Sequence, residues 1–308
     1  MIRPARLREG AGIALVAPAG PLPPGALERA VEQVTAWGGR PLPGRHAAGS
    51  HHGYLSGRDE ERLGDLQEAL SSPAVDAIWC LRGGYGTMRL LQQIDWRPML
   101  ERPRPLIGFS DNTALHLALV RRGLVSFHGP HAAADPFPPF TGERLRELLV
   151  RPEPAGALPL PEAPGERPVA IRGGTAEGPL VGGNLALLAA TLGTPDALQA
   201  KGAILFFEEV GEPAYRIDRL LTQLELAGVL DAVAGVVVGG MTEVPVTTRD
   251  DIPPVREVLA ERLHDRGVPV LTGCPFGHID EMWTLPLGVR ARLDADAGTL
   301  ELLEAAVQ

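Results

Sequence analysis

The sequence has few cysteines and lacks the ligand spacings that are typical of metal-binding motifs. Cys80 and Cys274 are the only cysteines in 308 residues, which is too few for a disulfide framework. Cys80 lies in an apolar run and Cys274 just before a proline, so we expect two buried free thiols. Neither a CxxC nor an HExxH spacing is present, and the sequence therefore indicates no metal site.

Positive charge and long apolar runs are also scarce. Lys201 is the only lysine, and the formal net charge is -9. Nucleic acids and anionic membranes require a basic face, so this balance argues against both as partners. No run reaches the roughly 20 apolar residues of a membrane span. The apolar stretch 13–20 follows three arginines, as in a signal peptide, but it is short and broken by Pro18. It predicts a first strand instead, and we expect a cytoplasmic protein.

The composition that remains is that of an ordinary globular protein, with 44% hydrophobic and 22% charged residues. From residue 1 to 150, short apolar runs alternate with amphipathic stretches. This alternation predicts a parallel sheet covered by helices on both faces, in an N-terminal α/β domain. Such sheets bind ligands at the carboxyl ends of their strands. The predicted strands are 12–18, 75–81, 106–109 and 125–127.

The composition and the pattern of apolar residues change after residue 150. Residues 151–168 are rich in proline and follow neither the helical nor the strand period, which predicts a linker or extended crossover. Residues 169–308 contain several short strand patterns and three helix patterns. We expect a second, smaller α/β domain with a mixed sheet. The glycines of the stretch 181–193 indicate a loop followed by a helix start.

Ser110 stands where a strand meets a helix. The apolar run 106–109 precedes it, and Asp111, Asn112 and Thr113 are residues that begin helices. A serine at such a turn holds its hydroxyl above the sheet, as a nucleophile must. The common elbow pattern has a glycine two residues later, where this chain has Asn112. The local pattern leaves two interpretations open, an exposed nucleophile or a helix cap.

A serine nucleophile needs a base and a group that orients the base. His278 lies in a glycine-bounded loop between two predicted strands, and Glu208 and Glu209 end an apolar strand. A carboxylate at a strand end can be buried enough to orient an imidazole. The alternative is that the two acids merely begin a loop or helix.

The segment RGGYG at 82–86 follows a predicted strand. It lacks the spacing of a phosphate-binding loop, so no nucleotide cofactor is indicated. Backbone N–H groups of a glycine turn can instead bind an anion, and Gly83, Gly84 and the N–H of Asp111 are candidates for an oxyanion hole.

Seven segments, in order along nearly the whole chain, give the sequence a specific resemblance. It resembles the LD-carboxypeptidase family of serine peptidases, also called muramoyltetrapeptide carboxypeptidases, whose relatives include the microcin C immunity proteins. The segments are YLSGRDEERLGDLQEAL, AIWCLRGGYGTMRLL, LIGFSDNTALHLAL, FHGP, GPLVGGNLALLAATLGT, ILFFEEVGEPAYRIDRLLTQL and GHIDEMWTLPLGVRARLD.

The resemblance implies a catalytic triad of Ser110, Glu208 (rather than Glu209) and His278. With Ser110 as nucleophile, we expect the N–H groups of Gly84 and Asp111 to stabilise the oxyanion. The resemblance also implies a flavodoxin-like or glutaminase-like first domain and a smaller, barrel-like second domain. Members of the family release terminal D-alanine from the L-configured centre of a cell-wall peptide during cytoplasmic recycling. They need no metal or other cofactor and are commonly dimers. We therefore expect a muropeptide or small peptide as substrate and a homodimer.

The resemblance leaves the substrate and the substrate contacts open. An immunity-type amidase that cleaves aminoacyl or peptidyl nucleotides is one alternative, and a non-catalytic muropeptide-binding module is another. The short, proline-rich segment 132–140 favours the peptidase, because an immunity protein is expected to carry a longer aromatic loop there. Arg82, Gly83 and Tyr85 are candidates for substrate binding. Arg82 would pair with the substrate carboxylate, unless it is a structural arginine at the domain interface.

Overall fold

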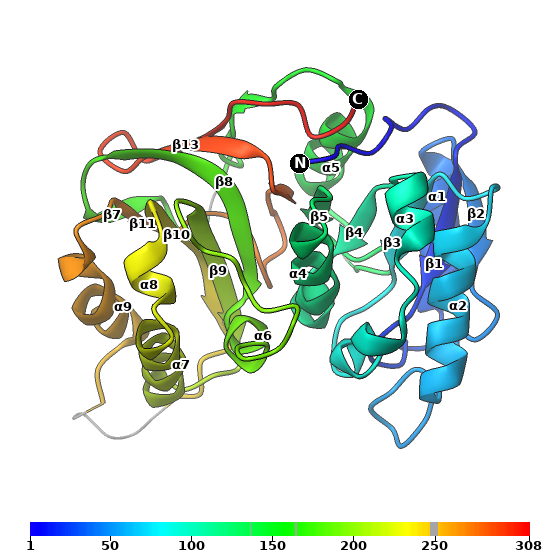
Figure 1. Ribbon diagram of the computed structural model, residues 1–308, viewed down its shortest axis with the longest axis horizontal. Helices are drawn as coiled ribbons and strands as arrows, with labels where there is room; N and C mark the ends of the chain where they lie inside the picture. The colour runs from blue at the N-terminus through cyan, green and yellow to red at the C-terminus, as the bar shows by residue number, and fades with distance from the viewer. Residues whose placement is uncertain (136, 164, 247–251) are drawn as a thin grey trace.

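The computed structural model describes residues 1–135, 137–163, 165–246 and 252–308, and these residues are arranged around two β-sheets. The sheets lie side by side, with helix α4 (Thr113–Arg121) between them (Figure 1). Both sheets contain parallel strands, so the predicted α/β class is confirmed. The described part of the chain has no helix with both the length and the apolar character needed to cross a membrane.

The first sheet has six strands in the order β12-β5-β4-β3-β1-β2. Five of them are parallel and come from the first 130 residues, as the alternating pattern predicts. They are β1 (Gly12–Val16), β2 (Arg40–Pro43), β3 (Ala77–Cys80), β4 (Leu106–Gly108) and β5 (Ser126–His128).

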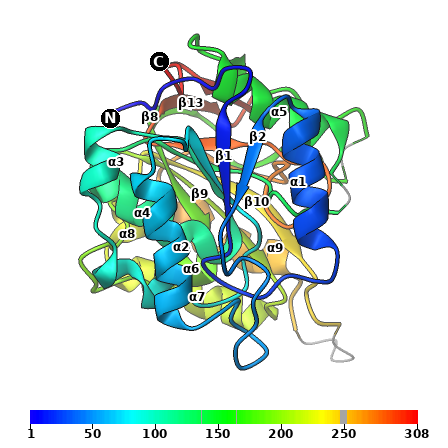
Figure 2. The same cartoon turned by 90° about the vertical axis from the view of Figure 1, so that its right-hand side faces the viewer.

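Helices cover both faces of this sheet. In Figure 2, α1 (Ala26–Ala36) and α2 (Asp59–Ser71) lie on opposite sides of β1. Successive residues of a strand face opposite ways, and the core follows this rule. Ile13 and Leu15 are buried in the cluster that includes α1. Ala14 and Val16 are buried in the cluster that includes α2. The remaining helices of this half are α3 (Arg97–Glu101) and α5 (Pro139–Val150).

The sixth strand comes from the far end of the chain. β12 (Leu285–Leu287) pairs antiparallel with β5 and forms one edge of the first sheet. No pattern in the sequence predicts this strand. It joins the last part of the chain to the sheet of the first half by backbone hydrogen bonds.

The second sheet is mixed and has eight strands in the order β6-β14-β13-β8-β9-β10-β11-β7. The strands β8 to β11 are parallel, and their neighbours on either side are antiparallel. The strands are β6 (Gly156–Ala157), β7 (Val169–Arg172), β8 (Thr175–Asn184), β9 (Ile204–Val210), β10 (Gly235–Thr242), β11 (Val270–Thr272), β13 (Arg290–Asp294) and β14 (Thr299–Leu302). The helices are α6 (Leu185–Ala190), α7 (Ala214–Leu226), α8 (Val229–Ala232) and α9 (Val255–Leu263).

The long strand β8 corrects one prediction. Residues 181–183 were expected to form a loop, but they continue β8 and pair with β9. Gly182 and Gly183 have φ values of 154° and 142°. A Cβ on Gly182 would lie 1.8 Å from the carbonyl oxygen of Phe206, and one on Gly183 would lie 2.5 Å from the side chain of Thr113. These glycines therefore mark close backbone approach within a strand, not a turn.

Two further segments differ in detail from the sequence pattern. The apolar residues Met88, Leu90 and Leu91 predict a helix after the glycine loop, but the chain there forms two short 3₁₀ turns, Thr87–Arg89 and Leu91–Gln93. The predicted linker 151–168 contributes the short strand β6, which pairs with β14. Both cysteines are buried free thiols, as predicted.

Candidate active site

Ser110 occupies a strained turn at the carboxyl end of β4. Its φ angle is 59°, in the left-handed region that non-glycine residues seldom adopt. Such a conformation costs on the order of 1–3 kcal/mol and is found mainly at functional sites. A 3₁₀ turn, Ser110–Asn112, leads directly into α4, whose N-cap residue is Asn112. The strained turn leaves Ser110 partly exposed, while Asp111 and Asn112 are buried beneath it.

A chain of two hydrogen bonds joins Ser110 to residues from the second half of the chain. The hydroxyl oxygen of Ser110 is 3.2 Å from Nε2 of His278. Nδ1 of His278 is 2.6 Å from Oε2 of Glu208, which lies near the carboxyl end of β9 and is completely buried. The three residues that the sequence singled out therefore meet in space. This arrangement can transfer a proton from the hydroxyl to the imidazole while the carboxylate holds the ring.

The electrostatic surroundings favour a charged His278. Burial alone would lower the pKa of His278, but the hydrogen bond and charge of Glu208, together with the charges of Glu209 and Glu243, outweigh it. The net result is a pKa above the ordinary value of 6.5. An imidazolium that forms during proton transfer is thus stabilised by the carboxylates around it.

Glu208 and Glu209 have different partners. The carboxylate of Glu209 accepts hydrogen bonds from the side-chain amide of Asn184 at 2.9 Å, from N–H of Ala186 at 2.7 Å and from its neighbour Val210 at 2.9 Å. Burial raises the pKa of Glu209, and these hydrogen bonds oppose the rise. Glu209 therefore fixes the start of α6, whereas Glu208 faces His278.

Two glycines allow the triad residues to approach their neighbours. A Cβ on Gly83, which is buried, would lie 2.7 Å from both Cβ and Oγ of Ser110. Gly277 precedes His278 and has φ 102°, and a Cβ there would lie 2.6 Å from Cβ of Glu208. Both positions must lack a side chain for Ser110, His278 and Glu208 to keep this arrangement.

The segment 82–86 lies beside Ser110, but its residues differ in exposure and in the neighbours that they contact. Gly83 packs against Ser110, whereas Gly84 is exposed and its Cβ position faces Gly20. The exposed guanidinium of Arg82 donates to the carbonyl oxygen of Pro21. Tyr85 is 51% exposed.

Asp111 ties this loop to the nucleophile turn. Its carboxylate accepts a hydrogen bond of 2.8 Å from the N–H of Thr87, directly after the glycine loop. Burial raises the pKa of Asp111, and the bonds from Thr87 counteract this. The two loops on which an oxyanion hole would depend are therefore held together.

Three other histidines lie near Ser110 and are buried or partly buried as neutral rings. His131 stacks on Phe109 at 4.3 Å between ring centroids, and burial and the nearby His278 lower its pKa to about 3. Burial lowers the pKa of His116 to about 4, and that of His128 well below 6.5. The sequence places His128 and His131 near this end of the sheet, but nothing in it shows that His131 packs behind Ser110.

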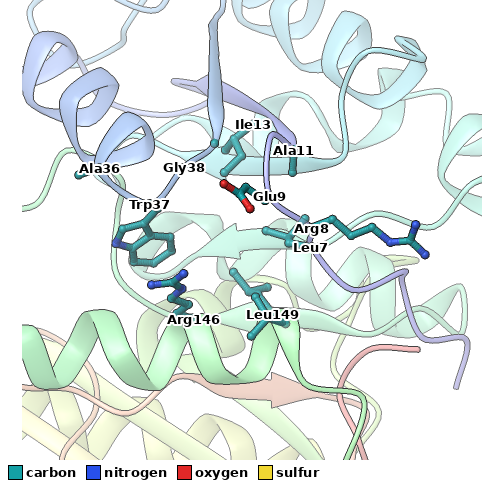
Figure 3. A pocket seen from close by; sticks show the side chains of 12 residues that line it. Leu7, Arg8, Glu9, Ala11, Ile13, Ala36, Trp37, Gly38, Arg146 and Leu149 are labelled. Carbon is teal, nitrogen blue, oxygen red and sulfur yellow. The ribbon is translucent and has the colours of Figure 1, made fainter.

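Two pockets differ in their relation to this site. One of about 590 Å³ borders the loop after His278 and is lined by Ile279, Asp280 and Glu281 among others. Another, of about 390 Å³, lies at the opposite end of β1, where Trp37, Arg146 and Glu9 line it (Figure 3). Ser110 lies at the carboxyl end of a strand, which is the end of a parallel sheet at which substrates bind. The pocket in Figure 3 lies at the amino end of β1 and is therefore at the opposite end of the sheet's strands from Ser110. Among the residues that the structure describes, no three His, Cys, Asp or Glu side chains are grouped to hold a metal ion.

Comparison with known proteins places these residues in a family context. Two family models match: one described as the LD-carboxypeptidase N-terminal domain covers residues 13–129, and one described as the LD-carboxypeptidase C-terminal domain covers residues 177–293. A putative carboxypeptidase of Streptomyces coelicolor is 44% identical over 98% of this chain and 96% of its own length.

Solved structures agree with the sequence relatives. A muramoyltetrapeptide carboxypeptidase from Oxalobacter formigenes superimposes with a TM-score of 0.81 at 33% identity, over 95% of this chain and 98% of its own. The microcin C7 self-immunity protein MccF, in complex with glutamyl sulfamoyl guanosine, superimposes with a TM-score of 0.91 at 25% identity, over all of both chains. The shared fold extends over both sheets.

Proposed function

Because the chain belongs to the LD-carboxypeptidase family and is thus a serine-type carboxypeptidase, we propose that it releases terminal D-alanine from LD-linked murein tetrapeptides. The proposed setting is the recycling of cell-wall peptides in the cytoplasm. The observation that carries the proposal is the hydrogen-bonded chain from Ser110 through His278 to Glu208. Relatives named murein tetrapeptide carboxypeptidase, such as that of Pseudomonas aeruginosa, support the class of substrate.

In the proposed reaction, Ser110 is the nucleophile. His278 takes the hydroxyl proton through Nε2 as the oxygen attacks the scissile carbonyl, and Glu208 stabilises the resulting imidazolium through Nδ1. The imidazolium then protonates the amine of the departing D-alanine, which leaves an ester on Ser110. A water molecule, deprotonated by the same imidazole, hydrolyses this ester and frees the shortened peptide.

The developing oxyanion requires preorganised donors. We assign the backbone N–H groups of Gly84 and Asp111 to this role. The left-handed turn at Ser110 and the hydrogen bond between Asp111 and Thr87 support the assignment, since they fix the two loops that carry these N–H groups.

The free carboxylate of the substrate needs a cation or a cluster of N–H groups. Arg82 is our candidate for this role. Gly83 and Tyr85, on the same loop, are candidates for other substrate contacts, because the three residues flank the proposed oxyanion donor Gly84. Arg82 is exposed and bonded only to the surface carbonyl of Pro21 among the described residues, so its guanidinium is available to an incoming carboxylate. As in the family, we propose that the enzyme acts as a homodimer, which the molar mass in solution would test.

Replacement of the triad residues tests the proposal. Ser110→Ala and His278→Ala should each reduce the turnover of an LD-linked tetrapeptide by at least about a thousandfold while the circular dichroism spectrum and melting temperature remain near those of the wild type. Retention of more than about a tenth of the activity in Ser110→Ala would exclude Ser110 as nucleophile. An active-site serine probe should label the wild type and fail to label Ser110→Ala. A wild type that resists the probe would indicate a muropeptide-binding module without catalysis.

A second candidate function is suggested by the fold shared with MccF, which was solved with an aminoacyl sulfamoyl nucleoside. An amidase of this immunity type would use the same serine and base. Side-by-side assays of a tetrapeptide and an aminoacyl sulfamoyl nucleoside separate the two functions. Hydrolysis of the nucleoside conjugate alone would replace the proposed function by this one.

A further inference from the structure

The exposed aromatic rings of this chain are few, and two of them meet beside the nucleophile. All three tyrosines are more than half exposed, whereas no phenylalanine or tryptophan within the described ranges is exposed. Tyr54 and Tyr85 are each 51% exposed, and their ring centroids are 5.9 Å apart. His52 extends the group, because its ring stacks with that of Tyr54 at 6.0 Å. We call Tyr54, Tyr85 and His52 the aromatic rim.

The aromatic rim is connected to Ser110 by a short series of backbone contacts. Tyr85 is two residues from Gly83, which packs against Ser110. The carbonyl oxygen of Gly83 accepts a 2.9 Å hydrogen bond from N–H of Gly20. A Cβ on Gly20 would lie 3.7 Å from the carbonyl oxygen of Tyr54. The loops that carry Tyr54 and Tyr85 thus meet at Gly20, at the carboxyl end of the first sheet.

These loops are held rigidly despite their exposed rings. Residues 51 and 55 exchange backbone hydrogen bonds of 2.8 and 3.0 Å, and Leu55 is buried. The guanidinium of Arg62 is buried and donates to carbonyl oxygens in three segments. These are Pro18, near Gly20, then Gly57 at 3.1 Å, after Tyr54, and Gly86 at 3.0 Å, next to Tyr85. A rigid surface loses little entropy when a ligand binds, so exposed rings on it are suited to recognition.

The shape and chemistry of the aromatic rim favour a sugar ring. The C–H groups of a pyranose carry partial positive charge and pack against the negative faces of aromatic rings. The planes of Tyr54 and Tyr85 are inclined by 57°, so the two rings do not form the parallel slot that would sandwich a flat base. The phenol hydroxyls and the imidazole can hydrogen-bond to ring hydroxyls and to an acetamido group.

The short chain separation between Gly83 and Tyr85 limits how far Tyr85 can lie from Ser110. The α-carbons of Gly83 and Tyr85 are separated by at most about 7.6 Å, and the tyrosine side chain reaches farther outward. In a murein tetrapeptide, the scissile carbonyl belongs to the third residue and the sugar is attached ahead of the first. Three extended residues span about 10 Å, so the sugar of a bound muropeptide lies on the same length scale from the scissile carbonyl as Tyr85 can lie from Gly83.

We propose that the aromatic rim is a subsite for the N-acetylated muramoyl sugar that carries the peptide. This inference rests on the proposed function, because it assigns the muropeptide's glycan end to a place beside the catalytic serine. Such a subsite would make the enzyme bind sugar-linked peptides more tightly than free peptides of the same sequence.

Binding measurements with the Ser110→Ala protein test the subsite without turnover. Calorimetric titrations would use a tetrapeptide with and without its N-acetylmuramoyl group. Adding Tyr54→Ala and Tyr85→Ala together should raise the Kd of the sugar-linked peptide about tenfold and that of the free peptide less than twofold. Tyr54→Phe with Tyr85→Phe, which keeps the rings, should retain most of the affinity. Leu226→Ala, at an 83% exposed position on α7, is the matched surface control and should change neither Kd.

Several results would overturn the subsite. An equal loss of affinity for both peptides would mean that the rim binds the peptide, and an unchanged Kd for the sugar-linked peptide would mean that it binds neither. A loss confined to an aminoacyl nucleoside would assign the rim to a base. Failure of the wild type to hydrolyse either peptide would refute the proposed reaction alone, because the sugar-dependent difference in Kd is measured independently of hydrolysis.

Discussion

Replacement of Gly83 by alanine tests whether the position of the Ser110 hydroxyl limits catalysis. The new Cβ would lie 2.7 Å from Oγ of Ser110 and 3.3 Å from Cε1 of His131. Ordinary contacts begin at 3.4 Å, so the hydroxyl must move by about 0.7 Å if the backbone keeps its place. His131 stacks on Phe109 and blocks escape on its side. The methyl group is therefore expected to displace the Ser110 hydroxyl and to disturb its 3.2 Å hydrogen bond with His278.

The structure gives the size of the expected effect. A displacement of about 1 Å from the productive geometry can reduce the rate about a hundredfold, so Gly83→Ala should lower kcat roughly 30- to 100-fold. Overpacking of a tight site costs about 1–3 kcal/mol of stability, which a domain of this size tolerates. We expect a folded protein with a modestly lower melting temperature. Labelling of Ser110 by a serine probe should slow in parallel with kcat.

A second glycine provides the control. Gly64 lies on α2 with no atom within 4 Å of its Cβ position. Gly64→Ala should leave kcat unchanged and stabilise the helix by about 1 kcal/mol. The assay is the release of D-alanine from an LD-linked tetrapeptide, with melting temperatures measured for both variants. If Gly83→Ala kept more than half of the wild-type kcat, the position of Ser110 would not depend on this contact.

The two adjacent glutamates should respond differently to replacement. Glu208→Gln should lower kcat about a hundredfold or more and shift the acidic limb of the kcat/KM profile to lower pH, since the charge that raises the pKa of His278 is lost. The raised pKa of His278 in the folded protein stabilises the wild type fully below the unfolded pKa of 6.5, and this stabilisation is lost as the pH rises through the folded pKa. The difference in free energy of unfolding between the wild type and Glu208→Gln should therefore become smaller at alkaline pH. A difference that grows there would contradict the pairing of Glu208 with His278. Glu209→Ala should instead lower the free energy of unfolding by roughly 2–4 kcal/mol, because three donors, two at the start of α6 and one at the end of β9, lose their acceptor. Urea unfolding and serine labelling report these effects, and normal stability of Glu209→Ala would refute the structural role.

The parts of the fold that follow local patterns could be predicted from the sequence. The parallel strands of the first sheet are short apolar runs bounded by turn residues, and four of the five were predicted at their observed places. Apolar residues on both faces of a strand are required wherever helices cover both sides of a sheet. The strand at 181–184 was missed because glycine pairs normally indicate turns. Only the tertiary structure reveals that Phe206 and Thr113 leave no room for side chains there.

The candidate site divides in the same way. The strand-to-helix turn made Ser110 a candidate, and the resemblance over nearly the whole chain supplied its predicted role and its predicted partners. No local signal shows that His278, 168 residues away, comes within 3.2 Å of the hydroxyl. Likewise, the packing of Gly83 against Ser110 and the meeting of Tyr54 with Tyr85 arise from contacts between separate loops. Such contacts depend on strand order, which one sequence does not specify.

The strand β12 has a consequence for the timing of synthesis. A ribosome completes the sheet-forming segments β1 to β5 long before residues 285–287 emerge, so the nascent first sheet has β5 as a bare edge. Unpaired edges recruit other chains, which makes an incomplete product vulnerable to aggregation. The same late segment begins just after His278. The edge strand of the first sheet and the proposed base, His278, are therefore both made long after β1 to β5. A product that stops before residue 278 should hydrolyse no peptide.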